Sequence, residues 1–478
     1  MRSRTTVRLA VLSPYWDFWQ HTVASALRAE LRADAESLAR RLAGYVEVVA
    51  VAQPESPSEA EQMASRLGPL DVVVVHSAMA APPRTVTAFL TAIERSSRLA
   101  TSPGVVVFAA IAPGSAVTGD FDHRDITRHG ATVGAPMAVS ALRRVGVEPF
   151  VVLGRIDDKA TFDRLRDAVR RAGAVARLRR ARVGTIGEPL PGYDHVITDA
   201  ERLRSRLGVT LVSISPAEVA AAYEAIDRKR IEPLYAELSA RFRLGAGATG
   251  ESLERTLRVA AAVEDLCAIY RLDGGAMNCH VPGIRLGEPI GVAPCYGIGR
   301  MTSRGVPFTC VGDVLSSIAM VAVAALGHPT LYHELEALDF DTGEFVVANS
   351  GEHDDRFWPP AVQLELRRND WFLSEGNLCS LCVEGVLRHG PATLVNLVED
   401  TDGGYRFVTA RGALSGRGFT GTGTTNGGFR FAASDAVAVW EAWARAGVGH
   451  HSCLTISDVS SDVADLARHL GATHQVVC

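Results

Sequence analysis

The sequence predicts an α/β protein with two doubly wound, Rossmann-like α/β domains followed by a mainly antiparallel, barrel-like β domain. Two observations lead to this prediction. Through the first two thirds of the chain, short β-branched runs alternate with longer stretches of helical spacing, which is typical of parallel sheets covered by helices on both faces. From about residue 327 the pattern changes to alternating strands separated by turn residues, which is typical of antiparallel sheets.

The first domain is expected over residues 1–177. Five apolar runs mark its strands: VRLAVLS, YVEVVAVA, LDVVVVHS, GVVVFAAI and EPFVVLG. Pockets in parallel sheets open beyond the carboxyl ends of the strands, so the loops after Ser13, Ser77 and Ile111 are candidate binding loops. Trp16 belongs to an aromatic group that follows the first strand. This group would either line a pocket or pack in the core.

The second domain, expected over residues 178–326, follows a charged helix at about 158–180. Its strands are marked by ARVGTIG and GVTLVSIS, and helical spacing extends over about 216–242 and 250–270. The apolar run from Val314 to Leu326 is shorter than the roughly 20 residues that a membrane span requires, so it predicts a buried helix.

The third domain is expected over residues 327–478. It has turn signals at DTGE, RHGP and EDTDGGYR, and helical spacing near its end at SSDVADLARHLG. The glycine-rich run GRGFTGTGTTNGG, residues 416–428, raises the question of a phosphate loop. No lysine follows the run and it does not open a helix after a strand, so a surface or interface loop is the preferred interpretation.

The composition argues against several classes of function. A net charge of −5 with 22% charged residues provides no broad basic field, so nucleic acids and membrane surfaces are not expected partners. Lys159 and Lys229 are the only lysines, and both have charge-rich surroundings. Schiff-base chemistry is therefore not expected, because it needs a lysine desolvated in a pocket.

The eight cysteines lie mostly in apolar segments, which is typical of buried thiols in a reducing compartment. Cys379 and Cys382 form a CxxC motif, but no second ligand pair with zinc spacing accompanies them, so strand packing is preferred. The apolar run at the N-terminus is shorter than the hydrophobic region of a signal peptide. We therefore expect a cytoplasmic protein.

Three blocks of the sequence resemble the metal-dependent L-arabinose and L-fucose isomerase family in their order and spacing. They are the stretch 291–355 with FTCVGDVL and LYHELEAL, the central ARVGTIGEPLPGYDHVITDAERLRSRLGV, and the terminal GHHSCLTISDVSSDVADLARHLGA. GDFDHRDITRHGATVGAPM also resembles the family's segment with a substrate-facing histidine, which would be His129. The resemblance covers most of the chain. It implies an aldose–ketose isomerase, usually with manganese, in a closed homo-oligomer, expected to be a hexamer, with its pocket between subunits.

The expected reaction requires a divalent cation and acid–base groups. The cation, chelated by neighbouring sugar oxygens, acidifies the carbon-bound hydrogen and stabilises an enediolate, while two carboxyl groups pass the proton between C1 and C2. Oxygen ligands combined with imidazole suit manganese. At the matching positions the resemblance implies Glu334 and His451 as metal ligands, with Glu334 also acting as a catalytic carboxylate.

The sequence departs from the family's pattern at two positions. Where the family has glutamate before Gly-Asp, this sequence has Val311, which can neither bind a metal nor carry a proton. The family's histidine ligand corresponds here to Asn349. We expect Asp313 to compensate as a catalytic carboxylate and Glu352 as a metal ligand. The expected substrate contacts are His129, Trp16, Asn349, His353 and His450.

Each candidate residue also has a purely structural alternative. Asp313 directly precedes an apolar helix and would serve as its N-cap. Glu334 would be a solvated charge on a helix that also carries Glu336. The remaining candidates would be a packed histidine (His129), exposed residues (Glu352, His353) or a loop pair near a helix start (His450, His451).

Two functions from different classes are compatible with these residues. The first is an enzyme: an aldose–ketose isomerase, or a relative that uses the same chemistry for epimerisation or carbon–carbon cleavage on a modified sugar. The second is a sugar-binding paralogue without catalysis, since loss of a general base lowers a rate by about 10²- to 10⁴-fold. The enzyme is preferred because both Glu334 and His451 remain.

Overall fold

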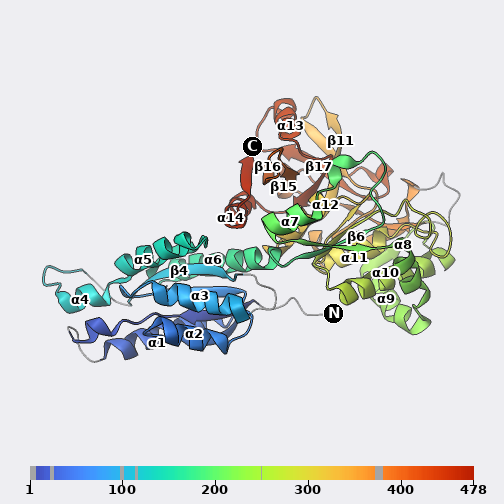
Figure 1. Ribbon diagram of the computed structural model, residues 1–478. Coiled ribbons are helices and arrows are strands. Elements are labelled where there is room, and N and C mark those ends of the chain that lie inside the picture. Colours follow the sequence, from blue (N-terminus) through green and yellow to red (C-terminus); the bar gives the residue numbers. More distant parts are fainter. Residues whose placement is uncertain (1–6, 22–25, 97–101, 113–116, 249, 372–379) are drawn as a thin grey trace. The chain divides into compact units, whose positions relative to one another are not determined.

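The computed structural model describes residues 7–21, 26–96, 102–112, 117–248, 250–371 and 380–478 (Figure 1). The chain divides into two compact units, Met1–Arg180 and Ala181–Cys478. Each unit has its own sheets and its own core. The finer division into three domains stays a prediction.

The first unit is built on a five-stranded parallel sheet with the strand order β2-β1-β3-β4-β5. All six residues of the central strand β3 are buried, as expected when helices cover both faces of a parallel sheet. The α/β pattern predicted for this part is confirmed. Its strands are β1 (Arg8–Leu12), β2 (Glu47–Ala52), β3 (Val72–Ser77), β4 (Gly104–Ile111) and β5 (Phe150–Arg155). Its helices are η1 (Asp17–His21), α1 (Leu27–Leu42), α2 (Pro57–Ser65), α3 (Arg84–Ser96), α4 (His123–Arg128), α5 (Ala131–Arg144) and α6 (Lys159–Leu178).

The second unit begins with a four-stranded parallel sheet of order β10-β9-β6-β7. The single helix expected at about 216–242 is two helices, because Asp227 caps a new helix by accepting a hydrogen bond from the Arg230 backbone. The strands are β6 (Arg182–Ile186), β7 (Thr210–Ile214), β9 (Gly274–Met277) and β10 (Phe308–Cys310). The helices are η2 (Asp194–Val196), α7 (Ala200–Leu207), α8 (Pro216–Glu224), α9 (Arg228–Arg241), α10 (Gly250–Tyr270), α11 (Cys295–Ser303) and α12 (Val314–Ala325).

A ten-stranded mixed sheet completes the second unit. Six of its strands pair antiparallel in a closed ring, β16-β15-β18-β11-β12-β17 and back to β16, as in a small barrel. β19 adds to β16, and β14, β13 and β8 extend the sheet from β17. The strands are β8 (Phe242–Leu244), β11 (Leu331–Asp339), β12 (Glu344–Ala348), β13 (Leu364–Arg368), β14 (Leu381–Val386), β15 (Gly390–Glu399), β16 (Tyr405–Leu414), β17 (Thr425–Phe431), β18 (His451–Thr455) and β19 (Thr473–Val476). The helices are η3 (Asp355–Phe357), η5 (Thr420–Thr422), α13 (Ala436–Arg445) and α14 (Ser460–Leu470).

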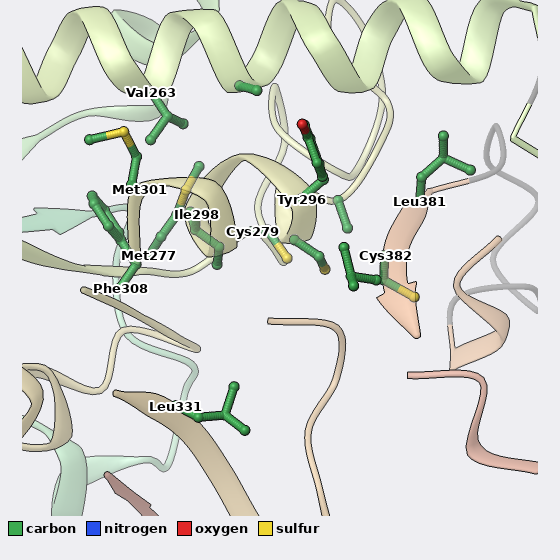
Figure 2. Packing of buried hydrophobic residues seen from close by; sticks show 14 of the residues in the cluster. Val263, Met277, Cys279, Tyr296, Ile298, Met301, Phe308, Leu331, Leu381 and Cys382 are labelled. Atoms are coloured by element: carbon green, nitrogen blue, oxygen red, sulfur yellow. The ribbon is translucent and has the colours of Figure 1, made fainter. Parts of the chain in front are cut away.

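One hydrophobic core connects the parallel sheet and the mixed sheet of the second unit. Figure 2 shows Tyr296 and Ile298 of α11 among side chains from α10, β9, β10, β11 and β14. Eleven of the twelve residues of α12 are buried, so the apolar run at 314–326 is a core helix, as predicted. Among the described residues, no helix is long and apolar enough to cross a membrane.

Three local predictions come out differently or only in part. Glu334 lies on strand β11 and not on a helix, which removes the solvated-helix alternative. The glycine-rich run 416–428 is a loop only at its start, because its last residues belong to β17. Cys382 packs in β14, whereas Cys379 lies outside the described residues.

Candidate active site

The turn between β10 and α12 contains a strained residue. Val311 has a φ of +47° and Gly312 one of +78°. A β-branched residue in this left-handed region is a true outlier, and such a conformation costs roughly 1–3 kcal/mol. The turn brings Asp313 to the first position before α12. The strain therefore lies at the position where the resemblance expects a catalytic glutamate.

Both carboxylate oxygens of Asp313 are engaged. Oδ1 accepts a hydrogen bond from the Ser316 backbone at 2.9 Å, so the alternative that Asp313 is the N-cap of α12 is confirmed. Oδ2 lies 2.7 Å from Nδ1 of His451. Asp313 is buried and therefore acts locally as an anchor that orients the His451 ring.

His451 lies between two carboxylates. It is the first residue of β18 and is paired in register with Glu334 of β11, which brings their side chains together. Nε2 of His451 lies 3.1 Å from Oε1 of Glu334, on the opposite side of the ring from Asp313. The Asn396 amide donates to the His451 carbonyl at 2.6 Å and fixes the backbone.

The two carboxylates decide the protonation of His451. Burial lowers the pKa of His451, but the hydrogen bonds to Asp313 and Glu334 and the charges of both outweigh burial and raise it to about 9. For Glu334, burial acts in the opposite direction and raises the pKa. The hydrogen bond and charge of His451 outweigh burial and bring the pKa of Glu334 below its usual value. The site thus holds a proton on His451 between two anions, and a cation bound at Nε2 would have to displace this proton.

Glu336 is a carboxyl group at this site to which no catalytic or ligand role was assigned from the sequence. It is the extra residue of a β-bulge in β11, since Leu335 pairs with Val347 and Ala337 pairs with Val346. Bulges re-aim side chains and are frequent beside active sites. Burial and the charge of Glu334 raise the pKa of Glu336 to about 7, and its carboxyl shares a hydrogen bond with Glu334.

A pair of histidines adjoins the site. The rings of His450 and His451 have centroids 3.4 Å apart. Nδ1 of His450 lies 3.1 Å from Nε2 of His195, which belongs to η2 after strand β6. Tyr193 contacts both rings, with centroids 5.6 Å from His195 and 5.7 Å from His450. His195 was not predicted from the sequence to be a site residue. It follows the carboxyl end of a parallel strand, where pockets form, and this position could have identified it.

The donor atoms fit a divalent cation. The ligand atoms of Glu334, His450 and His451 all lie within 4.8 Å of one another. Two ligand atoms 3.1 Å apart, as in Glu334 and His451, can both bind one ion at about 2.2 Å with an angle of about 90° at the ion. The oxygen and imidazole donors suit manganese among other metals.

Three other predicted residues of the second unit lie outside the group formed by Glu334, His450 and His451. Glu352 is buried and in hydrogen-bond contact with Cys310; burial raises its pKa, and the charges of Glu334 and His451 also act on it. The Asn349 side-chain amide is hydrogen-bonded to the backbone at both ends. It donates to the Tyr332 carbonyl and accepts from the Gly351 N–H.

The His353 ring packs between aromatic side chains. Its neighbours are Tyr296, with centroids 5.8 Å apart, and Phe242, with centroids 5.9 Å apart. The ring is 1% exposed, because the chain after β12 turns into the core under α11. The alternative that Glu352 and His353 are exposed is wrong, because both are buried. The roles of Asn349 and His353 as substrate contacts stay predictions.

Trp16 and His129 belong to the first unit. Trp16 stacks on Phe18 with centroids 4.7 Å apart and meets Trp19 edge-on. His129 is the C-cap residue that follows α4 and lies against Phe121, with ring centroids 5.1 Å apart. Both are partly accessible, so neither is a core residue. Their roles as substrate contacts stay predictions.

A second group of ligand-type side chains consists of Cys279, His280 and Cys310, whose ligand atoms also lie within 4.8 Å of one another. A hydrogen bond from Cys310 and the charge of Arg285 lower the pKa of Cys279, although burial acts in the opposite direction. Arg285 also donates to Nδ1 of His280. Because the Arg285 guanidinium is hydrogen-bonded to the His280 imidazole, we interpret the group as a polar cluster and not as a metal site.

A cavity of about 480 Å³ adjoins Asp313. It lies beside the groups that hold His451 in place, since Asn396 and Ser316 both line it. Its other charged or ionisable lining residues are Asp194, His195, Arg202, Glu399 and Asp400. Carboxylates therefore outnumber cations on the cavity wall, and the Arg202 guanidinium is already paired with Glu399.

Comparisons with known proteins point to sugar isomerases. The chain is 24% identical over 334 residues to the sulfoquinovose isomerases of Priestia aryabhattai and of Priestia megaterium (strain ATCC 12872 / QMB1551), which covers 69% of this chain and 72% of each relative. No family model matches the chain. A solved structure, the first ketoreductase of the tylosin PKS, is 16% identical and covers 64% of this chain and 79% of that chain at a TM-score of 0.19, which supports no structural argument.

Proposed function

We propose that this protein is an aldose–ketose isomerase that acts on a sugar or modified sugar with a bound divalent cation, manganese being the expected ion. The observation that carries the proposal is the approach of Glu334 Oε1 to His451 Nε2 at 3.1 Å, with the His451 ring held from behind by Asp313. The similarity to sulfoquinovose isomerases supports the sugar and the reaction class. The resemblance to arabinose and fucose isomerases supports the metal.

Each residue of the site has a distinct part in the proposed reaction. A bound cation supplies positive charge that acidifies the hydrogen on the sugar carbon next to the carbonyl. His451 and Glu334 hold that cation, and Asp313 fixes the orientation of His451. Asp313 is thus a positioning residue in this proposal, because both of its oxygens are already bonded.

Glu334 and Glu336 are the carboxyl groups available for proton transfer. Val311 stands where the resembling family has its first catalytic carboxylate. Glu336 offers a replacement, since the bulge in β11 places its carboxyl in hydrogen-bond contact with Glu334. In the proposal Glu336 moves the proton between the two sugar carbons while Glu334 stays with the cation.

The substrate is proposed to be a hexose-type sugar with a modification. The relatives are named for sulfoquinovose, a sulfonated sugar. Most of the charged side chains that line the cavity beside Asp313 are carboxylates, and acidic groups repel a sulfonate. A sulfonate would therefore have to be bound away from this cavity.

A second candidate function is sugar binding without catalysis, or altered chemistry such as epimerisation. The observation in its favour is Val311, which leaves the position of one catalytic carboxylate without an acid–base group. Isotope exchange separates enediolate chemistry from sugar binding without catalysis, because an enediolate can exchange its carbon-bound hydrogen with solvent. The product, a ketose or an epimer, then separates isomerisation from epimerisation.

The decisive experiment uses the purified chain with manganese in deuterium oxide. A panel of aldoses and ketoses, including sulfoquinovose, is incubated and examined by nuclear magnetic resonance for deuterium at C1 or C2. We expect exchange and ketose formation with at least one sugar, and loss of both in Glu334→Gln. Binding of a sugar with no exchange in any member of the panel would contradict the isomerase and support the binding protein.

A further inference from the structure

The proposed metal site has fewer protein ligands than a stable site needs. Catalytic metal sites commonly use three protein ligands and leave further positions for substrate and water. The positions that would supply two more ligands here are Val311, which has no donor atom, and Asn349, whose amide is bonded to the backbone. Glu334 and His451 alone would leave the cation weakly held.

His450 has a donor atom in reach of the same point. Successive residues of a regular strand point to opposite faces, so a neighbour of His451 within β18 would point away. His450 precedes the first residue of β18, so the alternation of side chains within the strand does not apply to it. Its ring lies against that of His451, and its ligand atom is within 4.8 Å of those of Glu334 and His451.

His195 has the geometry to select the required tautomer of His450. A histidine that binds a metal through one ring nitrogen donates its other N–H to a neighbouring acceptor, which fixes the ring. Nδ1 of His450 lies 3.1 Å from Nε2 of His195. When Nδ1–H of His450 donates to His195, Nε2 of His450 keeps a lone pair for the cation.

The two histidines come from different parts of the second unit. His195 lies in η2, between β6 and α7, whereas His450 lies 255 residues later, before β18. Tyr193 packs against both rings and restricts their rotation. The contact thus joins a loop of the parallel sheet to the barrel strand that carries the site.

We propose that His450 is a third ligand of the metal site and that His195 is a positioning residue that holds it. This inference rests on the proposed function, because it concerns the same cation. It assigns to this chain a ligand set of Glu334, His450 and His451 in place of the set that the resemblance implies. The outer partners are then Asp313 for His451 and His195 for His450.

The test compares two substitutions of His195 by measuring manganese affinity. His195→Phe keeps an aromatic ring beside Tyr193 and His450 but has no acceptor, whereas His195→Gln provides a carbonyl acceptor. The dissociation constant of Mn²⁺ is measured by electron paramagnetic resonance, with no sugar present. We expect the phenylalanine variant to bind about 10- to 100-fold more weakly and the glutamine variant to bind close to the unmodified chain.

A spectroscopic measurement and a control complete the test. Cobalt replaces manganese, and the visible absorption of the bound ion reports the loss of an imidazole ligand in His450→Ala. His389→Ala, which removes a solvent-exposed histidine in the turn before β15, is the control and should leave affinity and spectrum unchanged. Thermal unfolding with a chelator present checks that all variants are equally folded.

The outcomes separate this inference from the proposed function. If the unmodified chain binds Mn²⁺ and both His195→Phe and His450→Ala bind it equally well, the inference is overturned and the proposed function stands. If His195→Gln is as weak as His195→Phe, the hydrogen bond is not the cause and the positioning role is overturned. If the unmodified chain binds no divalent cation, the proposed function itself fails.

Discussion

At the scale of single residues, the site is organised around one imidazole. His451 is bonded on one side to Asp313, on the other to Glu334, and its carbonyl is held by Asn396. Asp313 also caps α12, so one carboxylate connects the start of a core helix to the candidate ligand. A carboxylate behind a metal-binding histidine fixes its orientation and increases its basicity.

Substitution of Asp313 by asparagine should separate these two roles. Asparagine caps helices as well as aspartate does, so any loss of thermal stability should come from the lost ion pair with His451 and not from the cap. The charge behind His451 is lost, and Mn²⁺ affinity should fall about 10- to 100-fold, measured by calorimetric titration. Asp227→Asn, at the N-cap of α9, should alter neither quantity. Unchanged affinity in Asp313→Asn would show that Asp313 is only a cap.

The backbone at Val311 should be a measurable source of instability. Glycine adopts a φ of +47° without the steric cost that valine pays there, so Val311→Gly should raise the free energy of unfolding by about 1 kcal/mol, measured with denaturant. Val346→Gly is the matched control, because Val346 is a half-buried valine in regular strand β12 and its loss should destabilise. Equal destabilisation by both would argue against strain.

At the scale of elements, two strands and one turn create the site. The antiparallel register of β11 and β18 places Glu334 opposite His451, and the bulge in β11 adds Glu336. The strained turn after β10 delivers Asp313. Asp313 and His451, which these features bring together, are 138 residues apart in the sequence.

The bulge predicts a catalytic effect for Glu336. Glu336→Gln keeps a hydrogen-bonding group but cannot carry a proton, so the rate of sugar deuterium exchange should fall about 10²- to 10⁴-fold. Mn²⁺ affinity should stay within a few-fold of the unmodified chain, because Glu336 is not among the proposed ligands. Glu441→Gln, on the outer side of α13, serves as control. Full activity in Glu336→Gln would exclude Glu336 as the proton carrier.

The sequence was sufficient for some of these elements and insufficient for others. Alternating runs identified the strands of the parallel sheet, and the N-cap at Asp313 follows from its position before an apolar helix. Glu334 and His451 were predicted to share a site, and they are in contact. The bulge at Glu336 was not predictable, because it depends on register with β12 and not on local sequence. The same holds for His195, whose contact with His450 is set by tertiary packing.

At the scale of the molecule, the second unit combines a parallel sheet and a closed barrel around one core, and the site lies where they meet. Asp313 starts a helix after the parallel sheet, whereas Glu334 and His451 are in the barrel.

Buried histidines occur in both units and are kept neutral by desolvation. Burial lowers the pKa to about 4 in the buried His76, His333 and His353 and in the half-buried His280.

These histidines predict that acid destabilises the fold. A folded-state pKa of about 4 lies below the ordinary value of 6.5, so between these two values the unfolded chain binds more protons than the folded one. The free energy of unfolding should therefore fall as the pH drops from about 6.5 to about 4. His76→Asn keeps a hydrogen-bonding group near Ser13 and should make this fall smaller. His389→Asn is the control, and an identical pH slope in His76→Asn would contradict the explanation.

The most direct test of the central claim is a crystal structure of the chain grown with Mn²⁺ and measured for anomalous scattering. The account predicts one anomalous peak within about 2.0–2.5 Å of both Glu334 Oε1 and His451 Nε2, and no such peak in a Glu334→Gln crystal. No peak at this position in the unmodified chain, or a peak only beside Cys279 and Cys310, would contradict it.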